Sequence, residues 1–456
     1  MTEKVIIIGA GLGGLALARG LKTSNIPFTI YESDVKNCEL TDYRISVNSI
    51  GGHALKELLS QDLFDIFQLT SAIPLNRFLV VDGQLNTLLE SKMERRMDVP
   101  PEGCDRAMSR LLLRQLLLEG LEDDIHFDRT YDHHVEDEDG LITVHLTDGT
   151  TDRCLMLVGA DGIISSVRKQ ILPHARLYDT KMIVISGRCR DGASVGTLHD
   201  DSVAHLHGPN GSGGVIYNAR YTPMEEILRQ LDDTQRSKFS GDPQSLLPRC
   251  RSMMIDGRYW NLWFTSEKLP EKFVRLEGSE MLPIAIDVTK QTGYSTSIID
   301  MIEDSDPHSV FSTPEWSCVP MDPWEPTAAT LLGDAVHATS RFEANTTLRD
   351  AVVLCEAIRD VWDDATSPST SPSDRKRTIR TAVGLYERQM REYAYPLVIA
   401  SRSDNGMSSV QRSPTASWLT DLMFRASLKL FNLILPVRNL SSWMDHTAGT
   451  QREKRE

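Results

Sequence analysis

One short segment of this sequence lacks glycine where a loop would need it. In "GDAVHATSRFEANTTLRDA", residues 333–351, no glycine follows Gly333. The seven cysteines form no CxxC pair, and the twelve histidines show neither HxxxH nor HExxH spacing. These absences argue against a disulfide framework and against a zinc site, so we predict reduced thiols and no metal.

Positive charge and long apolar runs are also scarce. The net charge is 49 − 64 = −15, which argues against a nucleic-acid partner. No run of eighteen apolar residues occurs, so no transmembrane span is predicted. No signal peptide precedes "KVIIIGAG", which favours a cytoplasmic protein. Residues 419–440 are apolar with interspersed basic side chains; they fit either peripheral membrane contact or, as we favour, a packed C-terminal helix.

The N-terminal segment carries the pattern of a dinucleotide-binding unit. A buried β-branched run at residues 5–8 leads into GxGxxG at Gly9, Gly11 and Gly14, then a helix, a second strand and Glu32. The glycines allow a tight turn, the approach of a pyrophosphate, and close packing of helix on strand, and the acid suits an adenosine ribose. This pattern predicts a dinucleotide but does not separate NAD from FAD.

Two later segments narrow the choice. "GADGIISSVRKQIL" carries Asp161 and Gly162 after one apolar run, and "LLGDAVH" carries Gly333 and Asp334 after another. With these three motifs in order, the chain resembles the single-component FAD-dependent monooxygenases of the aromatic-hydroxylase type, especially the fungal members of natural-product pathways. The resemblance covers roughly residues 3–405.

The resemblance implies a role for each matched residue. The three glycines would hold the FAD pyrophosphate, Glu32 the adenosine ribose and Asp334 a ribityl hydroxyl. Arg110, which opens a helix, would reach the FAD; the alternative, a solvated helix charge, fits Arg114 better. Further cofactor-binding candidates are Asp161 and Gly162 near the pyrophosphate, Gly333 in the GD turn, Arg44 and Ser46 in "YRISVNSIGGHAL", and Ala344 and Asn345 after the glycine-free loop. The alternative for Arg44 is a surface charge.

The implied chemistry is oxygen transfer. NADPH or NADH would reduce the FAD, and O2 would supply the atom that hydroxylates or epoxidises an organic natural-product intermediate. Arg188 and Tyr217 are the candidates for the substrate side, and the alternative is that both are ordinary strand residues. His337 follows the GD turn, and a structural role is favoured for it over proton transfer.

The expected fold class is α/β: a Rossmann-like FAD-binding domain, a second and mostly antiparallel sheet for the substrate, and C-terminal helices. The predicted FAD domain is discontinuous, comprising residues 1–75, 101–180 and 316–364. Residues 76–100 and 181–315 form the predicted substrate domain, and residues 376–445 the helices. Residues 365–374, rich in Ser and Pro, read as a mobile linker.

The glycine-free segment leaves two hypotheses. The resemblance implies a loop such as PxxGxGAN after GD; here Ala344 and Asn345 match its end, Arg341 stands where proline is usual, and Glu343 precedes the match. A carboxylate there would oppose an anionic reduced flavin. The favoured hypothesis is a working monooxygenase with an adapted loop. The other is a non-redox or redox-impaired protein on the same fold, such as a cyclase, an isomerase or a degenerate copy.

Overall fold

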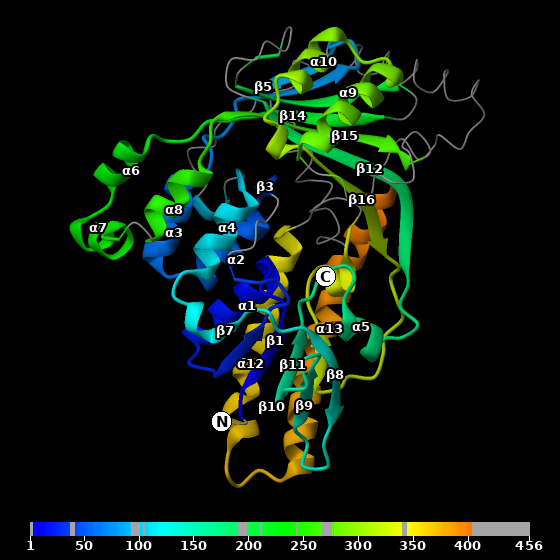
Figure 1. The fold of residues 1–456 in the computed structure, drawn as a ribbon. Helices are drawn as coiled ribbons and strands as arrows, with labels where there is room; N and C mark the ends of the chain where they lie inside the picture. The colour runs from blue at the N-terminus through cyan, green and yellow to red at the C-terminus, as the bar shows by residue number, and fades with distance from the viewer. Residues whose placement is uncertain are drawn as a thin grey trace, which may run out of the picture.

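The structure is a computed structural model that describes most of the chain. The described residues are 3–36, 42–92, 101–103, 105–189, 198–199, 201–209, 212–242, 245–266, 276, 278–339 and 344–403. They form a parallel sheet with its helices, shown at the bottom of Figure 1, and a larger sheet at the top. This architecture confirms the expected α/β class with a separate, mostly antiparallel sheet.

The parallel sheet consists of short strands that are almost wholly buried. Its order is β17-β11-β1-β2-β7, with bounds β1 Val5–Ile8, β2 Phe28–Tyr31, β7 Ile125–His126, β11 Met156–Gly159 and β17 Ala329–Leu331. Continuous apolar runs suit such strands because both faces of the sheet are covered by other elements. The helices around it are α1 Leu12–Thr23, α2 Ser49–Leu58, α3 Gln61–Thr70, α4 Arg110–Leu118, α5 Ser166–Ile171 and α11 Asp334–His337.

The larger sheet has the order β16-β12-β15-β14-β13-β4-β5. Its strands are β4 Arg77–Asp82, β5 Thr87–Lys92, β12 Leu177–Cys189, β13 Ser202–His207, β14 Gly213–Ala219, β15 Gly257–Thr265 and β16 Phe311–Cys318. All neighbours are antiparallel except β13 and β4. Helices α9 (Met281–Thr292) and α10 (Thr296–Glu303) cover one face, where Trp260 is fully buried. The other face is turned toward the parallel sheet.

Three helices inside the predicted substrate domain pack on the other body. They are α6 Met224–Gln230, α7 Asp233–Ser240 and α8 Leu246–Met253. Their buried side chains, including Ile227, Phe239 and Leu246, join the core that contains β1 and α1. The predicted boundary placed this segment with the large sheet; α8 instead packs on α4, and Gln235 of α7 donates a hydrogen bond to Asp62 of α3.

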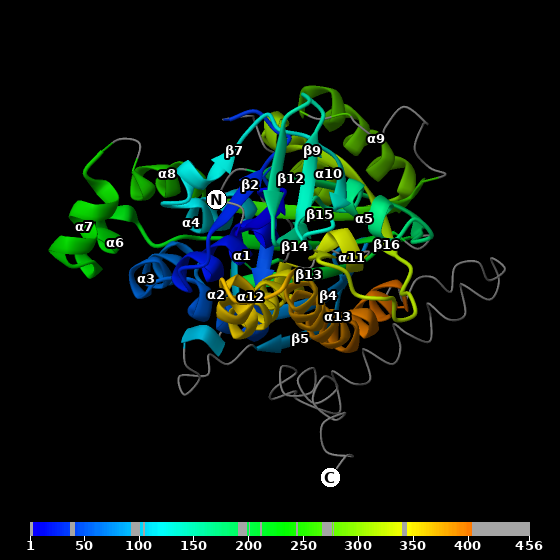
Figure 2. The same cartoon turned by 90° about the horizontal axis from the view of Figure 1, so that it is seen from below.

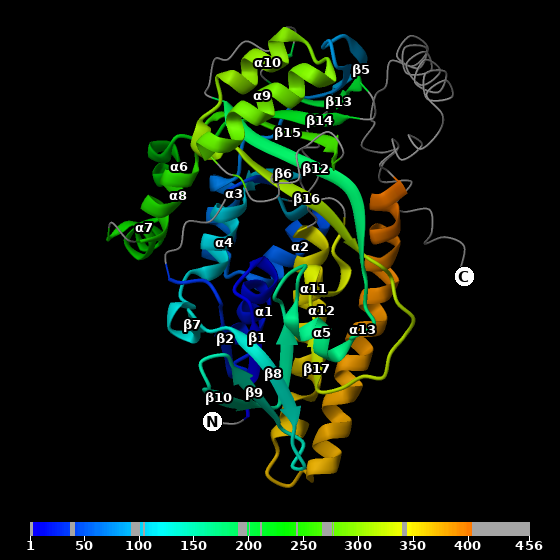
Figure 3. The same ribbon diagram turned by 45° about the vertical axis from the view of Figure 1, so that its right-hand side comes forward.

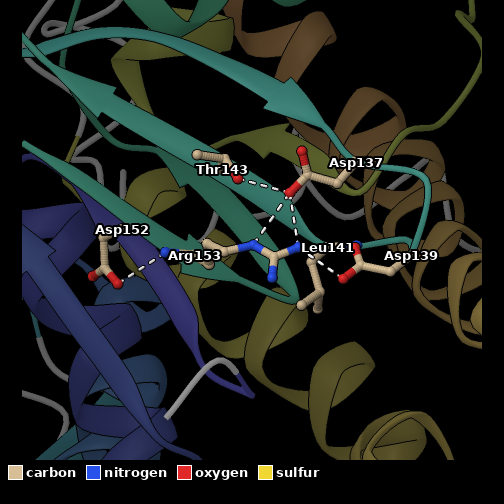
Figure 4. Close-up of polar contacts among 6 residues, drawn as sticks. All are labelled: Asp137, Asp139, Leu141, Thr143, Asp152 and Arg153. Carbon is tan, nitrogen blue, oxygen red and sulfur yellow. Dashed lines mark hydrogen bonds and ion pairs between the residues drawn. The ribbon is translucent and has the colours of Figure 1, made fainter.

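A small antiparallel sheet extends the lower end of the molecule. It is formed by β8 Tyr131–Glu136, β9 Ile142–Leu146 and β10 Thr151–Cys154, and β3 Arg44–Val47 pairs separately with β6 Arg106–Ser109. Figure 4 shows Arg153 reaching the β8–β9 turn, where its guanidinium bonds Asp137 and Asp139 at 2.9 and 2.7 Å. Thr143 donates to the same Asp137 carboxylate. These polar contacts fix the turn but are half exposed, so their stabilising effect is small.

Two long helices complete the fold. α12 (Ala344–Thr366) packs on α1, and α13 (Pro372–Ser403) runs beside α12 (Figures 2 and 3). The predicted linker at residues 365–374 is shorter in the structure: both helices extend into it, and Thr370 Oγ1 donates to Asp364 O at 2.6 Å across the turn between them. The apolar segment at 419–440 lies outside the described residues. Among the described helices, none is long and apolar enough to cross a bilayer.

The buried carboxyl of Glu387, on α13, should make the free energy of unfolding depend on pH. Its carboxyl is buried against β17, where it accepts a bond of 2.9 Å from Thr330 Oγ1. Burial raises its pKa from 4.5 to about 7, against the opposing effect of bonds from Thr330 and Trp324. The neutral acid therefore fits the fold, and the stability present below the unfolded pKa is lost as the pH rises through 7.

We expect wild-type protein to lose about 2 kcal/mol of unfolding free energy between about pH 5 and pH 7.5 through this group. Glu387→Gln should remove that loss and be the more stable protein at the higher pH. Urea unfolding of both proteins at the two pH values measures it. Equal pH dependence in the two proteins would show that Glu387 is not the titrating group.

Candidate functional site

The three motifs found in the sequence meet at one cavity. β1, β11 and β17 are neighbours in the parallel sheet, and the segment after the carboxyl end of each strand contributes to the wall. The cavity has a volume of about 160 Å³ and is lined by Gly11, Leu12, Gly13, Tyr43, Ile45, Arg110, Ala160, Gly162, Leu332, Gly333, Asp334, Ala344 and Thr347. Ligands of open α/β sheets bind at this edge, so the placement favours a nucleotide site.

The three glycines of the first turn are each present for a different physical reason. Gly9 has φ +105°, and a Cβ there would lie 2.5 Å from Ala160 O. A Cβ on Gly14 would overlap Gly9 O. A Cβ on Gly11 would meet no atom within 4 Å, although this residue lines the cavity. Packing therefore requires two of the glycines, whereas the third leaves space that a pyrophosphate fits. Gly11 is the N-cap residue of α1 and has no side chain to cap the helix, which suits an anion.

Glu32 and Arg114 both hold the turn. Glu32 Oε2 accepts the Ala10 amide at 2.6 Å, and Oε1 accepts the Asp34 amide at 3.0 Å. The buried carboxylate thus lies beside the glycine turn at the end of β2, where a ribose would share its lone pairs. Arg114 Nε donates to Ala10 O at 3.0 Å, so the interpretation of this arginine as a solvated helix charge is wrong. Helical spacing from Arg110 places it one turn further along α4, under the loop.

Arg110 lies on the cavity wall. It is the first residue of α4, and its guanidinium lies 5.5 Å from the Tyr43 ring centroid. Its amide donates to Tyr43 O at 2.9 Å, which fixes the start of the helix against β3. A cation in this position suits the phosphates of a dinucleotide.

The DG segment contributes backbone, not a carboxylate. Asp161 accepts bonds from Ser165 Oγ at 2.5 Å and from the amides of Ser166 and Val167 at 2.7 and 3.1 Å, so it caps α5. Gly162, with φ +72°, lines the cavity in its place. Arg168 ends the same motif and donates to Ala335 O at 2.8 Å, which connects α5 to the GD turn.

The GD turn is held by a residue that the sequence did not reveal. Asp350, on α12, is fully buried, and its Oδ2 accepts the Gly333 amide at 2.9 Å and contacts His337 Nε2 at 2.5 Å. Its Oδ1 accepts the Tyr393 hydroxyl at 2.6 Å. His337 is therefore a buried partner of Asp350, in the structural position expected for it. Asp334 is exposed and lines the cavity.

Side chains along β3 alternate in direction, and this decides which residues of the segment face the first cavity. Tyr43 and Ile45 line the first cavity, whereas Arg44 is buried toward the large sheet and the Ser46 side chain is exposed. Arg44 and Ser46 thus do not face this cavity, because successive strand residues point to opposite sides. Arg44 is also not the surface charge considered as its alternative.

At the start of α12, some residues line the first cavity and others do not. Ala344 and Thr347 line the cavity. The Asn345 side chain instead accepts the Asn48 amide at 2.9 Å and donates to Ser46 O at 3.0 Å, which attaches α12 to the segment after β3. Arg341 and Glu343 belong to residues 340–343, which lie outside the described residues.

A second cavity of about 370 Å³ separates the first from the large sheet. Its wall includes Tyr43, which both cavities share, together with Asp42, Arg44, Leu111, Ser186, Gly187, Arg188, Ser252, Met253, Ile255, Tyr259, Asn261, Asp306, His308, Ser309, Val310 and Phe311. Arg188 Nη2 donates to Asp306 Oδ2 at 3.0 Å. Tyr217 stands one layer behind: it stacks on Tyr259 and accepts from Asn261 Nδ2 at 3.4 Å. Of the two substrate-side candidates, Arg188 therefore reaches the cavity.

Among the described residues no cluster of metal-ligating side chains occurs.

Comparison with known proteins agrees with this geometry. No family model matches the chain. The dual O-methyltransferase/FAD-dependent monooxygenase CTB3 of Cercospora beticola is 24% identical over 389 residues, which cover 78% of this chain and 42% of the relative. The FAD-dependent monooxygenase dbaB of Emericella nidulans is 35% identical over 179 residues, 38% of this chain and 43% of the relative. The matched segments thus cover less than half the length of these relatives.

Solved structures show the same fold. Klebsiella pneumoniae HpxO, complexed with FAD and uric acid, superposes with a TM-score of 0.68 at 21% identity and covers 94% of this chain and 92% of its own. The 2,6-dihydroxypyridine-3-hydroxylase of Arthrobacter nicotinovorans gives 0.64 at 14% identity, covering 90% and 93%. This chain is therefore a relative of fungal FAD-dependent monooxygenases, and it shares its fold with these two solved structures.

Proposed function

We propose that the chain is an FAD-dependent monooxygenase that uses NADPH or NADH and O2 to hydroxylate or epoxidise an organic natural-product intermediate. The observation that carries the proposal is the convergence of the three motif turns on one cavity that adjoins a second, larger one. The relatives' names support the same activity. A cytoplasmic location belongs to the same proposal and is supported by the cysteines among the described residues, which are buried and free: Cys154, Cys189, Cys250, Cys318 and Cys355.

The residues of the first cavity fit FAD. Gly11 leaves space for a pyrophosphate, α1 offers its uncapped N-terminus, and Arg110 supplies a cation. Glu32 would bind the adenosine ribose and Asp334 a ribityl hydroxyl. A bound FAD supplies electron transfer from the nicotinamide and the activation of O2.

The chain's own contribution is binding, orientation and the exclusion of water. Tyr43, which borders both cavities, would separate the cofactor from the substrate by one ring. Burial raises the pKa of Tyr43 and, to about 12, that of Tyr221, so these phenols stay protonated at neutral pH and can donate hydrogen bonds. The second cavity is large enough for an aromatic substrate.

The first test of the proposed function is whether the purified protein contains bound FAD. Purified protein should be yellow, or become so with added FAD, and should release FAD on denaturation. Arg110→Ala should weaken FAD binding by about 1.5–3 kcal/mol through loss of a charge-assisted contact. NADPH and NADH oxidation should be stimulated by members of a panel of aromatic and polycyclic compounds. Bound FAD without stimulation by any of them would favour a non-redox protein.

The glycine-free loop gives a second prediction. α12 begins at Ala344, so its N-terminus faces the cavity that would hold the flavin. In the sequence, the four residues that precede Ala344 include Glu343 and no glycine. We expect weaker stabilisation of negative charge on a bound flavin than a loop with free amides would give. One such bond is worth on the order of 3 kcal/mol, or roughly 60 mV for two electrons.

Replacing residues 340–343 by a longer, glycine-containing PxxGxG segment should therefore raise the flavin reduction potential and speed reduction by NADPH. A redox titration and stopped-flow reduction of both proteins measure this. A higher potential in the native protein would mean that other groups supply the missing contacts.

A further inference from the structure

The carboxylate of Asp42 uses one of its two oxygens within the protein. Oδ1 accepts the Ser109 hydroxyl at 2.8 Å and the Leu111 amide at 3.2 Å, which places it at the N-terminus of α4. Among the described residues, no hydrogen bond and no ion pair reaches Oδ2. Asp42 is half-buried and lines the second cavity, so this oxygen is open to a ligand that enters there.

The arginine and aspartate side chains of this cavity balance in charge. Arg44 and Arg188 are matched by Asp42 and Asp306 in the described wall. Arg188 Nη2 pairs with Asp306 at 3.0 Å, and the Arg44 guanidinium lies 5.2 and 5.7 Å from the centroids of two tyrosine rings. Both arginines are therefore engaged, and a wall without an excess of either charge suits a neutral ligand.

Two other polar atoms of this wall lack a partner, but they are enclosed. Arg44 Nε and Ser186 Oγ make no hydrogen bond among the described residues, and both atoms are buried. A ligand would reach them only after a neighbouring side chain moved. Asp42 Oδ2 differs because it is accessible, and an ionised carboxylate oxygen accepts hydrogen bonds but cannot donate them.

The surroundings of Asp42 make this acceptor a strong one. Burial raises the pKa of Asp42, against the hydrogen bonds from Ser109 and Leu111 and the positive charge of Arg188. A carboxylate withdrawn from water gains more from a donor than an exposed one does, since fewer water molecules compete for it. A ligand that brings a donor to Oδ2 would therefore form a charge-assisted bond there.

We infer that the second cavity recognises a neutral ring that carries a hydroxyl, and that Asp42 Oδ2 accepts the hydrogen bond from this hydroxyl and so determines the specificity. Tyr43, Tyr259 and Phe311 in the same wall suit an aromatic ring. The inference rests on the proposed function and deepens it, because the ligand is the substrate of that reaction. Tyr43 borders both cavities, so the hydroxyl would be held beside the wall that they share.

The test exchanges the free acceptor for a donor. In Asp42→Asn, the Ser109 hydroxyl and the Leu111 amide still require an acceptor, so the amide oxygen takes the place of Oδ1 and the NH2 group that of Oδ2. The probes are 2-naphthol and 2-methoxynaphthalene, which both carry an oxygen although only the first can donate. At about pH 7 both are neutral.

Binding to the full chain is measured by equilibrium dialysis, with and without added FAD. The proteins are wild type, Asp42→Asn and the control Ser109→Ala, which loses one partner of Oδ1 and the cap of α4 but keeps Oδ2. Thermal unfolding of each shows that it is folded. Asp42→Glu, which moves the free oxygen by one methylene, replaces the asparagine variant if that one does not fold.

We expect wild type to bind 2-naphthol roughly 10- to 100-fold more tightly than 2-methoxynaphthalene. In Asp42→Asn this preference should be lost or reversed, because the NH2 group can donate to the methoxy oxygen but cannot accept from a hydroxyl. Asp42→Glu should also weaken the preference. Ser109→Ala should unfold at a lower temperature and keep the preference, which separates contact with the ligand from support of α4.

Equal binding of the two probes by wild type, or an unchanged preference in Asp42→Asn, would overturn the inference. Loss of the preference in Ser109→Ala would also overturn it, since Asp42 would then act through the position of α4. The proposed function fails separately. If wild type takes up no FAD, the flavoprotein assignment is lost, whereas dialysis of the FAD-free proteins still decides the role of Asp42.

Discussion

Asp350→Ala is expected to lower the free energy of unfolding by about 3–5 kcal/mol, because it leaves buried partners without their acceptor. The Asp350 carboxylate holds the Gly333 amide, His337 and the Tyr393 hydroxyl at 2.9, 2.5 and 2.6 Å. These partners come from the GD turn, α11 and α13, so one side chain connects three elements. The loss should therefore affect both the stability and the shape of the turn that carries Asp334.

Chemical denaturation of wild type, Asp350→Ala and Asp360→Ala measures this effect. Asp360 lies on the same helix with its side chain exposed, and its replacement should change stability by less than about 0.5 kcal/mol. Added FAD should protect Asp350→Ala less than wild type, since Gly333 and Asp334 line the cofactor cavity. Equal stability of the two variants would show that the three partners find other acceptors.

The same pair adds a pH dependence. Burial alone would lower the pKa of His337, but the charge and hydrogen bond of Asp350 outweigh it and raise the pKa. The stability gained from the protonated imidazole is complete below the pKa of an unfolded histidine and is lost as the pH rises through the folded value. Asp350→Asn should remove this part of the pH dependence.

The sequence predicted the turns of the cofactor site better than its side chains. GxGxxG, DG and GD identify local backbone conformations, and the parallel sheet brings their three strands together whatever lies between them. Asp161, a candidate for the cofactor site, accepts bonds from Ser165 Oγ and the Ser166 amide at the start of α5, because a carboxylate four residues before the N-cap serine can reach the free amides of the helix. Local spacing alone does not choose between these two uses.

Other parts depended on contacts distant in sequence. Asp350 is 17 residues from Gly333 and 43 from Tyr393, so no short motif contains the set. Arg44 was a candidate for the first cavity but lies on the other face of β3, because successive strand residues point to opposite sides and a short motif does not show which of them face the cavity. Arg114 carries no sequence signal of burial, since its partner is the carbonyl of Ala10, 104 residues away.

Gly11→Val is expected to abolish FAD binding, on the order of a thousandfold or about 4 kcal/mol, and to leave the unfolding of the FAD-free protein nearly unchanged. A Cβ at Gly11 meets no protein atom within 4 Å and enters the cavity that the pyrophosphate would occupy. Its φ of −74° is ordinary for any residue, so no backbone strain opposes the change.

Gly14→Ala is the matched comparison three residues further on. A Cβ there overlaps Gly9 O, so α1 must move away from β1, and this variant should lose stability in the absence of FAD. FAD titration by fluorescence and thermal unfolding, each on both variants, separate the two effects. Stability falls and binding fails together in Gly14→Ala, whereas in Gly11→Val only binding fails. If Gly11→Val instead binds FAD as wild type does, the open space above α1 is not the pyrophosphate site, and the cofactor assignment of this cavity is wrong.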